Sequence, residues 1–213
     1  MGSANRVVFS FMGGACVVLT VQDCTLVFDP ADHLSDDDIV KLRGTVITLF
    51  THHLDDHFHE RTVMKLVEMK SSLIVGTGEV CRAVASFVPS IKLMELKPRR
   101  GFRVGELKIY ALEGKHEVPT NLYYVTWGPS VLFAGDTGYV PLQKLKANLA
   151  FLPAGGSSFS TPESASMIAT EVGAQLVVPV HCSLEEAKRL AELLAGKTTV
   201  VILRPREVYE ATL

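Results

Sequence analysis

Short apolar runs that end in histidine or aspartate are the feature of this chain that most constrains its fold. The run Thr45–Phe50 is apolar and β-branched and follows the turn-forming Gly44, so it predicts a buried strand. The segment Thr51–His57 (THHLDDH) comes next and contains three histidines and two carboxylates. Neutral imidazole and carboxylate together suit divalent metals, so this composition predicts a metal site at a strand end. The alternative is a solvated helix start, in which Asp55 and Asp56 only complement the helix dipole.

Three further candidate ligands follow other apolar runs in the sequence. His116 and His181 each follow a strand-like run, and Asp136 lies in the turn Gly135–Gly138, whose glycines allow a tight bend. Taken singly, these residues fit a loop histidine, a helix-flanking histidine and a turn former. Their recurrence after successive strands instead predicts polar groups gathered on one edge of a sheet.

With these motifs in place, the chain resembles the metallo-β-lactamase superfamily, and in particular its small single-domain hydrolase-like members. The resemblance covers nearly the whole chain. It implies an α/β fold, the four-layer αββα sandwich, as one domain over residues 1–213 with metals at one edge of the sandwich. In chain order it rests on Phe28–Pro30, the THHLDDH segment, His116, Phe133–Gly138, Leu152–Gly156 and Pro179–His181.

The metal ligands follow from aligning this chain with the signature of that family, His-x-His-x-Asp-His followed by a distant His, a bridging Asp and a final His. The second signature histidine falls on Leu54, which cannot bind a metal. The resemblance therefore implies one firmly bound divalent metal, and a second that is doubtful because it keeps only His52 and His116 beside the bridging Asp136. Whether His53 replaces the missing ligand stays open. The implied ligands are His52, Asp56, His57, His116, Asp136 and His181.

Two positions around the site also bear on the comparison with the family. Relatives that resemble this chain carry a histidine after the first glycine of the N-terminal turn, where this chain has Gly14. Asp29 is similar to an aspartate that supports a ligand histidine from behind. The pair Asp29-Pro30 fits a simple strand-ending turn equally well.

The four cysteines form no C-x-x-C pair, so they indicate neither a zinc ribbon nor a dithiol redox motif. We expect reduced thiols, with a hairpin pairing of Cys16 and Cys24 as the alternative. Cys182 directly follows the last candidate ligand, and contact with metal or substrate is the less favoured interpretation of its position.

Composition excludes several classes of protein. With 213 residues, 47% hydrophobic and 21% charged, the chain has the composition of a globular domain with one sizeable core. A net charge of −2 gives no electrostatic argument for nucleic-acid binding. Neither a bilayer-spanning run nor a signal-type segment is present, so we expect a cytoplasmic protein with no membrane partner. The sequence does not indicate an oligomeric state.

The resemblance implies a metal-dependent hydrolase, with zinc as the expected metal and manganese or iron as alternatives. A bound divalent metal lowers the pKa of water to about 7, and Asp56 would ligate the metal and orient the water. The ligand set does not distinguish among small ester, amide, lactone or phosphodiester substrates. Leu54 removes positive charge from the site and predicts a weaker hydrolase. Two alternatives stay open: a non-catalytic metal-binding or ligand-binding descendant, favoured by Leu54 and Gly14, and an iron-dependent oxidoreductase with the same donors.

Periodicity and capping signals predict a chain of alternating strands and helices. Thr161 before Pro162 and Ser183 before Glu186 are typical of helix starts. Helices are predicted at 36–42, about 56–70, 79–87, 162–172 and 184–195, and strands at 6–11, 16–21, 25–28, 45–50, 72–75, 91–96, 103–112, 122–127, 131–134, 149–152, 176–180 and 199–203.

Overall fold

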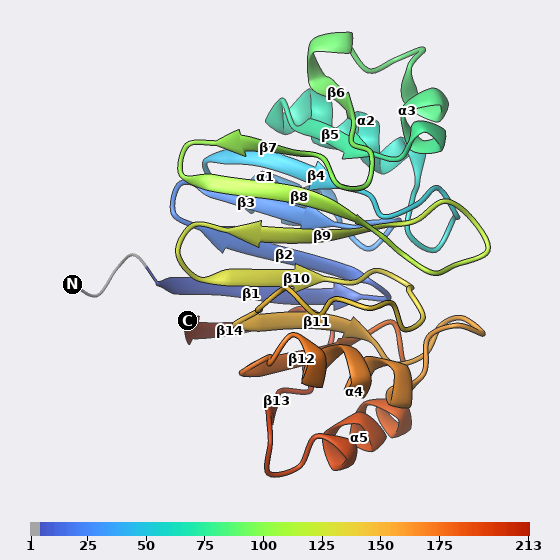
Figure 1. Ribbon diagram of the computed structural model, residues 1–213. Helices are drawn as coiled ribbons and strands as arrows, with labels where there is room; N and C mark the ends of the chain where they lie inside the picture. The colour runs from blue at the N-terminus through green and yellow to red at the C-terminus, as the bar shows by residue number, and fades with distance from the viewer. Residues whose placement is uncertain (1–4) are drawn as a thin grey trace. The chain divides into compact units, whose positions relative to one another are not determined.

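The computed structural model describes residues 5–213, and its strands form two mixed sheets of seven strands each (Figure 1). The chain divides into two compact units. Unit 1 runs up to Lys97 and includes Pro205–Thr212, and unit 2 consists of Pro98–Arg204 with Leu213. Each unit contains one of the sheets and its helices. The α/β class is thus confirmed, whereas the assignment of residues 1–213 to a single domain stays a prediction.

The sheet of unit 1 has the strand order β14-β1-β2-β3-β4-β5-β6. Strands β14 to β3 pair antiparallel, and β3 to β6 pair parallel. The carboxyl ends of β3, β4 and β5 therefore meet at one edge. The bounds are β1 (Arg6–Gly13), β2 (Cys16–Val21), β3 (Cys24–Phe28), β4 (Thr45–Leu49), β5 (Leu73–Gly76), β6 (Leu93–Glu95) and β14 (Glu207–Thr212).

Three α-helices belong to unit 1: α1 (Asp36–Lys41), α2 (Glu60–Lys70) and α3 (Gly78–Val84), with a 3₁₀ turn at Ser90–Lys92. A capping box on Ser35 starts α1, and its three acidic residues complement the helix dipole. Two apolar clusters join these helices to the sheet, and burying each large apolar side chain contributes roughly 1.5–3 kcal/mol. The first is Cys16, Val27, Leu34, Ile39, Leu42, Val46 and Leu66, and the second Phe50, Phe58, Val63, Ile74, Val80, Val84 and Val88.

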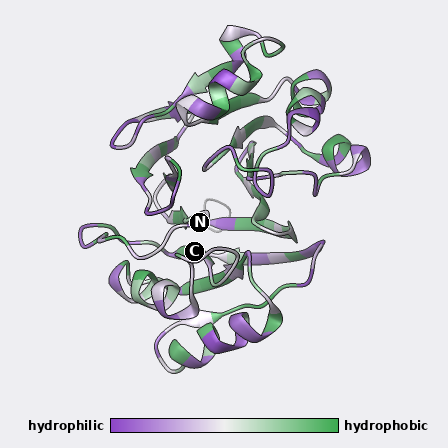
Figure 2. Ribbon diagram, turned by 90° about the vertical axis from the view of Figure 1, so that its right-hand side faces the viewer, coloured by the Kyte–Doolittle hydropathy of each residue, from purple (hydrophilic) through white to green (hydrophobic). Residues whose placement is uncertain are grey.

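The sheet of unit 2 has the order β13-β12-β11-β10-β9-β8-β7, antiparallel from β7 to β10 and parallel from β10 to β13. Helices α4 (Pro162–Glu171) and α5 (Leu184–Leu193) begin with capping boxes and bury apolar residues against it. Hydrophobic and hydrophilic residues alternate along the helices (Figure 2). The strands are β7 (Gly101–Val104), β8 (Leu107–Glu113), β9 (Asn121–Thr126), β10 (Ser130–Phe133), β11 (Leu149–Pro153), β12 (Leu176–Val180) and β13 (Thr199–Val200).

Several predicted elements differ from the observed ones. The helix expected from about residue 56 begins at Glu60, because the amides of His57 and Phe58 both bond to the Leu54 carbonyl in a preceding turn. The strand predicted at 103–112 is wrong, since β7 and β8 form a hairpin that turns at 105–106. Strand β14 was not predicted.

The described residues contain neither a membrane-spanning helix nor a disulfide bond. Between residues 5 and 213, no helix has the length and apolar character needed to cross a bilayer. The four cysteines are free thiols, and strand register places Cys24 opposite Val21 and Cys16 opposite Gly13. The hairpin disulfide is therefore excluded, and the expectation of reduced cysteines is confirmed.

Candidate metal centre

Asp29 is the anchor of the polar cluster in unit 1. Strands β3 and β4 are parallel neighbours, so the residues that follow them lie side by side, and the Asp29 amide donates to the Leu49 carbonyl at 3.1 Å. The Asp29 carboxylate is fully buried and accepts from the Thr51 amide at 2.7 Å and the Thr51 hydroxyl at 2.6 Å. Of the two interpretations of Asp29, the structure supports the positioning role.

The same carboxylate orients two predicted ligand histidines. His57 Nδ1 lies 2.8 Å from Asp29 Oδ2, and His52 Nδ1 lies 2.9 Å from Thr51 Oγ1. Because the Thr51 hydroxyl already donates to Asp29, its lone pair accepts from His52 Nδ1–H. The hydrogen-bond network thus assigns the proton to Nδ1 in both rings and puts the lone pair, the donor that a metal would need, on Nε2. The two buried rings are neighbours, with centroids 4.1 Å apart.

The loop after β3 supports His57 with strained backbone. Asp29 and Ala31 both have a φ of 40°, in the left-handed region that non-glycine residues rarely adopt. The Ala31 amide donates to the His57 carbonyl at 3.0 Å. Such strain costs of order 1–3 kcal/mol per residue and persists where the surroundings enforce it, which is typical of functional sites.

The other members of the THHLDDH segment have different surroundings. Asp56 has a half-exposed side chain, and its Oδ2 lies 3.9 Å from His57 Nε2. Leu54 is half-buried and offers only its carbonyl, which closes the turn before α2. His53 Nδ1 is buried without a hydrogen-bond partner among the described residues. We call Asp29, Thr51, His52, Asp56 and His57 the unit 1 cluster.

In unit 2, Asp136 and His181 meet at the carboxyl edge of the parallel strands β10, β11 and β12. His181 Nδ1 lies 2.5 Å from Asp136 Oδ1, and the Asp136 side chain is only 2% exposed. The Ser160 hydroxyl donates to the Asp136 carbonyl at 2.7 Å and so fixes the turn that carries the carboxylate. An imidazole nitrogen and a buried carboxylate oxygen at this distance share either a proton or a cation.

Gly156 makes room for the His181 ring. An ideal Cβ on Gly156 would lie 2.4 Å from His181 Nδ1, and the residue has a φ of +84°. Only glycine meets both conditions without displacing the imidazole. His181 itself has a φ of 48°, a further strained residue at a predicted ligand.

His116 lies on the loop that adjoins the Asp136 turn. The Lys115 amide donates to Thr137 Oγ1 at 2.7 Å, and the Gly138 amide donates to the Lys115 carbonyl at 2.9 Å. The His116 ring packs near Phe159, with centroids 5.6 Å apart. We call His116, Asp136 and His181 the unit 2 cluster.

The predicted ligands therefore fall into two groups, each assembled within its own unit. No role was predicted for Thr51 or Gly156 from the sequence. A hydroxyl directly before the first signature histidine was the available signal for Thr51, whereas the clash that requires Gly156 is visible only in three dimensions. Imidazole and carboxylate form a donor set that suits zinc, manganese or iron, so both clusters fit a divalent metal.

An imidazole also lies over the N-terminal turn, beside Gly13 and Gly14. It belongs to His33, which lies four residues after Asp29 in the sequence. An ideal Cβ on Gly14 would lie 2.5 Å from His33 Nε2, and one on Gly13 would lie 3.1 Å from His33 Nδ1. The bare backbone of the two glycines thus accommodates a histidine from another loop.

Cys182 packs at the margin of the apolar cluster of unit 2. Burial, together with the charge of Glu186, raises the pKa of the Cys182 thiol to about 11. These surroundings are those of a small apolar side chain rather than of a metal-bound thiolate.

Comparison with known proteins defines the class to which this fold and donor set belong. The profile of the beta-lactamase superfamily domain matches residues 9–181, so the chain belongs to this superfamily. It is similar to a UPF0173 metal-dependent hydrolase of Listeria monocytogenes serotype 4b, with 27% identity over 194 residues that cover 81% of this chain and 83% of the relative.

Solved structures confirm the fold. Igni18, a metallo hydrolase from the archaeon Ignicoccus hospitalis, matches with a TM-score of 0.82 and 17% identity over 98% of this chain and 99% of that one. The metallo-β-lactamase fold protein YhfI from Bacillus subtilis matches with a TM-score of 0.74 and 15% identity over 97% and 100% of the two chains. The expected metallo-β-lactamase fold is confirmed.

Proposed function

We propose that this protein is a metal-dependent hydrolase of a small-molecule substrate that binds one divalent metal firmly. The ligands that the resemblance to the family implies for that metal are Asp56, His57, Asp136 and His181. The observation that supports this most strongly is the buried Asp136 carboxylate hydrogen-bonded to the His181 imidazole, because both are donors of the kind that divalent metals bind. The relatives named metal-dependent hydrolases support the same class.

The four donors balance the charge of a divalent cation. Asp56 and Asp136 supply two negative charges, and the two imidazoles bind as neutral ligands. The Asp29 carboxylate holds His57 Nδ1–H and so keeps the His57 ring ready to bind through Nε2. Zinc is the metal we favour on this donor set, with manganese and iron as alternatives.

A second metal is weakly held in this proposal. His52 and His116 are the imidazoles left for it beside Asp136, and Leu54 supplies no donor where the family has its second signature histidine. Less positive charge then faces the developing oxyanion, so slower hydrolysis than in a two-metal relative follows.

The bound metal supplies hydroxide at neutral pH and polarises the substrate oxygen. Asp56, with its half-exposed carboxylate, accepts a proton from the attacking water and orients that water. Asp29 and Thr51 keep His57 and His52 in fixed tautomers, and Ser160 holds the Asp136 turn in place.

The test compares one ligand variant from each unit. His57→Ala and His181→Ala are each expected to lose the bound metal and the hydrolysis of p-nitrophenyl acetate or bis(p-nitrophenyl) phosphate by zinc-loaded protein. The matched control is His59→Ala, because His59 lies in the same segment but is exposed at the start of α2. It should retain both properties. If either variant kept full metal, its histidine would not be a ligand and the proposed ligand set would be wrong, and metal binding by the wild type without hydrolysis would identify a non-catalytic descendant.

A further inference from the structure

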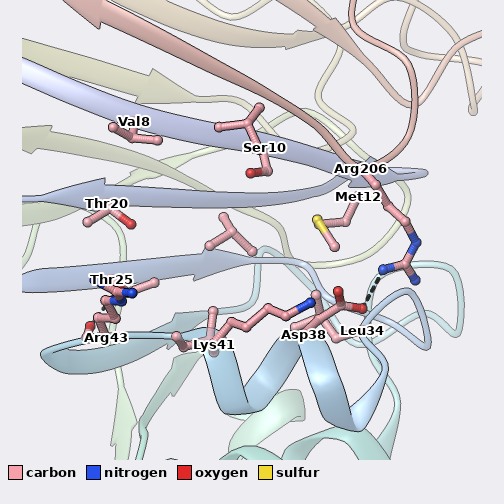
Figure 3. Close-up of a pocket in the computed structure, with 13 residues that line it drawn as sticks. Val8, Ser10, Met12, Thr20, Thr25, Leu34, Asp38, Lys41, Arg43 and Arg206 are labelled. Atoms are coloured by element: carbon pink, nitrogen blue, oxygen red, sulfur yellow. Dashed lines mark hydrogen bonds and ion pairs between the residues drawn. The ribbon is translucent and has the colours of Figure 1, made fainter.

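A cavity of about 510 Å³ lies in unit 1 between α1 and the face of strands β14, β1, β2 and β3 (Figure 3). Its volume is within the range of roughly 300–1,000 Å³ that small-molecule pockets occupy. None of the predicted metal ligands lines it. It is therefore separate from the proposed hydrolytic centre, and an inference about it does not depend on the proposed function.

The floor of this cavity is aliphatic. Val8 and Met12 on β1, Val18 on β2 and Val208 on β14 line it with Leu34, and Ser10 and Thr20 lie among them on the same strands. Val208 is 63% exposed, so part of this floor is open to solvent. No aromatic residue lines the cavity, so nothing there could stack on a nucleobase or an aromatic ring.

The rim carries an excess of positive charge. Arg206 pairs with Asp38, whose Oδ2 lies 2.5 Å from the guanidinium, so this pair is close to neutral. Lys41 and Arg43 are exposed and form no ion pair with any residue between 5 and 213. Arg43 lies at one end of the cavity and the Arg206–Asp38 pair at the other, with Lys41 between them (Figure 3). Two uncompensated cations therefore border an aliphatic floor.

We infer that this cavity binds a medium-chain aliphatic carboxylate, with the alkyl chain on the valine floor and the carboxylate at Lys41 and Arg43. The aliphatic floor matches an alkyl chain, because burial of each methylene is favourable by about 0.8 kcal/mol. The positive rim of Lys41 and Arg43 matches an anionic head, and hydroxyl groups on Ser10 and Thr20 add polar groups on the same sheet face. The Asp38 carboxylate on the rim is already paired with Arg206, and the lining includes no aromatic side chain, so a cationic or aromatic ligand is matched less well.

The experiment measures binding of decanoate to the intact chain by isothermal titration calorimetry, with acetate and decyltrimethylammonium as comparison ligands. Decanoate alone is expected to bind. Lys41→Met and Arg43→Met retain most of the apolar stem and remove the charge, and each should weaken decanoate binding by about tenfold. Ser10→Trp, which fills the cavity from β1, should abolish it. Lys188→Met on α5, an exposed lysine of unit 2, is the matched control and should leave the affinity unchanged.

Three binding results would each overturn the inference. They are absence of decanoate binding to the wild type, equal binding of decyltrimethylammonium, and decanoate affinity that Ser10→Trp leaves intact while its circular dichroism remains native. A self-associated wild type that Ser10→Trp makes monomeric would also overturn it, since a second copy of the chain would then cover the valine floor.

Discussion

Thr51 connects Asp29 to the His52 imidazole through a single hydroxyl. Its Oγ1 donates to Asp29 and accepts from His52 Nδ1, so the proton position on His52 depends on this residue. Sequence reasoning found the histidines but not this link, because the partner carboxylate lies 22 positions earlier and only the parallel pairing of β3 and β4 brings the two together.

We predict that Thr51→Val lowers metal affinity by about 10–100-fold, the usual cost of removing a group that orients a ligand histidine. Valine keeps the β-branched shape but cannot hold His52 in its tautomer. Thr51→Ser keeps the hydroxyl and should bind metal nearly as well as the wild type. Competition with a chromogenic chelator measures the affinities, and a Thr51→Val variant with wild-type affinity would remove this role from Thr51.

The space that Gly156 leaves for the His181 ring provides a second prediction. The Gly156→Ala variant places a Cβ 2.4 Å from the native position of His181 Nδ1, so we expect the ring to move and the metal to be lost. Gly196→Ala is the matched control, because Gly196 has a similar φ of +74° but open space around its Cβ position. In both variants the free energy of unfolding should fall by about 1–2 kcal/mol, the cost of an alanine in the left-handed conformation. Both should therefore unfold at a lower temperature than the wild type. Metal content measured on both folded proteins separates the two effects, and equal metal content would contradict the expectation.

At the scale of elements, local signals located the helices well and the sheet edges poorly. Capping boxes at Ser35, Thr161 and Ser183 start α1, α4 and α5 as the sequence predicts. The edge strand β14 escaped prediction because its residues are mostly exposed and it exists only by pairing with β1, about 200 positions away in sequence. Such pairing is a tertiary interaction that no short sequence window records.

Strand β14 and helix α1 are also joined by the Arg206–Asp38 pair. Burial opposes ionisation of Asp38, but hydrogen bonds from Arg206 and Ser35 outweigh it and lower the pKa of its carboxyl. A carboxyl with a lowered folded-state pKa stabilises the fold above its unfolded pKa of about 4, and this stability is lost as the pH falls through the folded-state value.

We therefore predict that Asp38→Asn reduces the urea midpoint at pH 7, and that the difference from the wild type shrinks as the pH falls below about 4. Asp37→Asn, in the same turn of α1, is the control for the helix dipole and should change the midpoint less. Urea titrations between pH 3 and pH 7 measure this. A difference that stays constant over that range would show that the Asp38 carboxylate does not stabilise the fold by its charge.

At the scale of the whole molecule, the order of motifs along the chain predicted the family and the fold. His52, His57, Asp136 and His181 all follow strands that end at a parallel edge, which is why a sequence pattern could locate them. The supporting contacts of Asp29, Thr51 and Gly156 follow from strand register and close packing, which a single sequence does not display. We propose that the number of metals the chain binds depends on position 54, where Leu54 offers no metal-binding side chain.

The most direct test of the account is metal content per chain, by elemental analysis of protein purified without added metal. We compare the wild type with Asp136→Ala and Leu54→His. We predict about one metal per chain in the wild type, loss of that metal in Asp136→Ala, and an increase towards about two in Leu54→His. A wild type that binds no metal, even after incubation with zinc, manganese or iron, would contradict the account and leave a metal-free protein on a hydrolase fold.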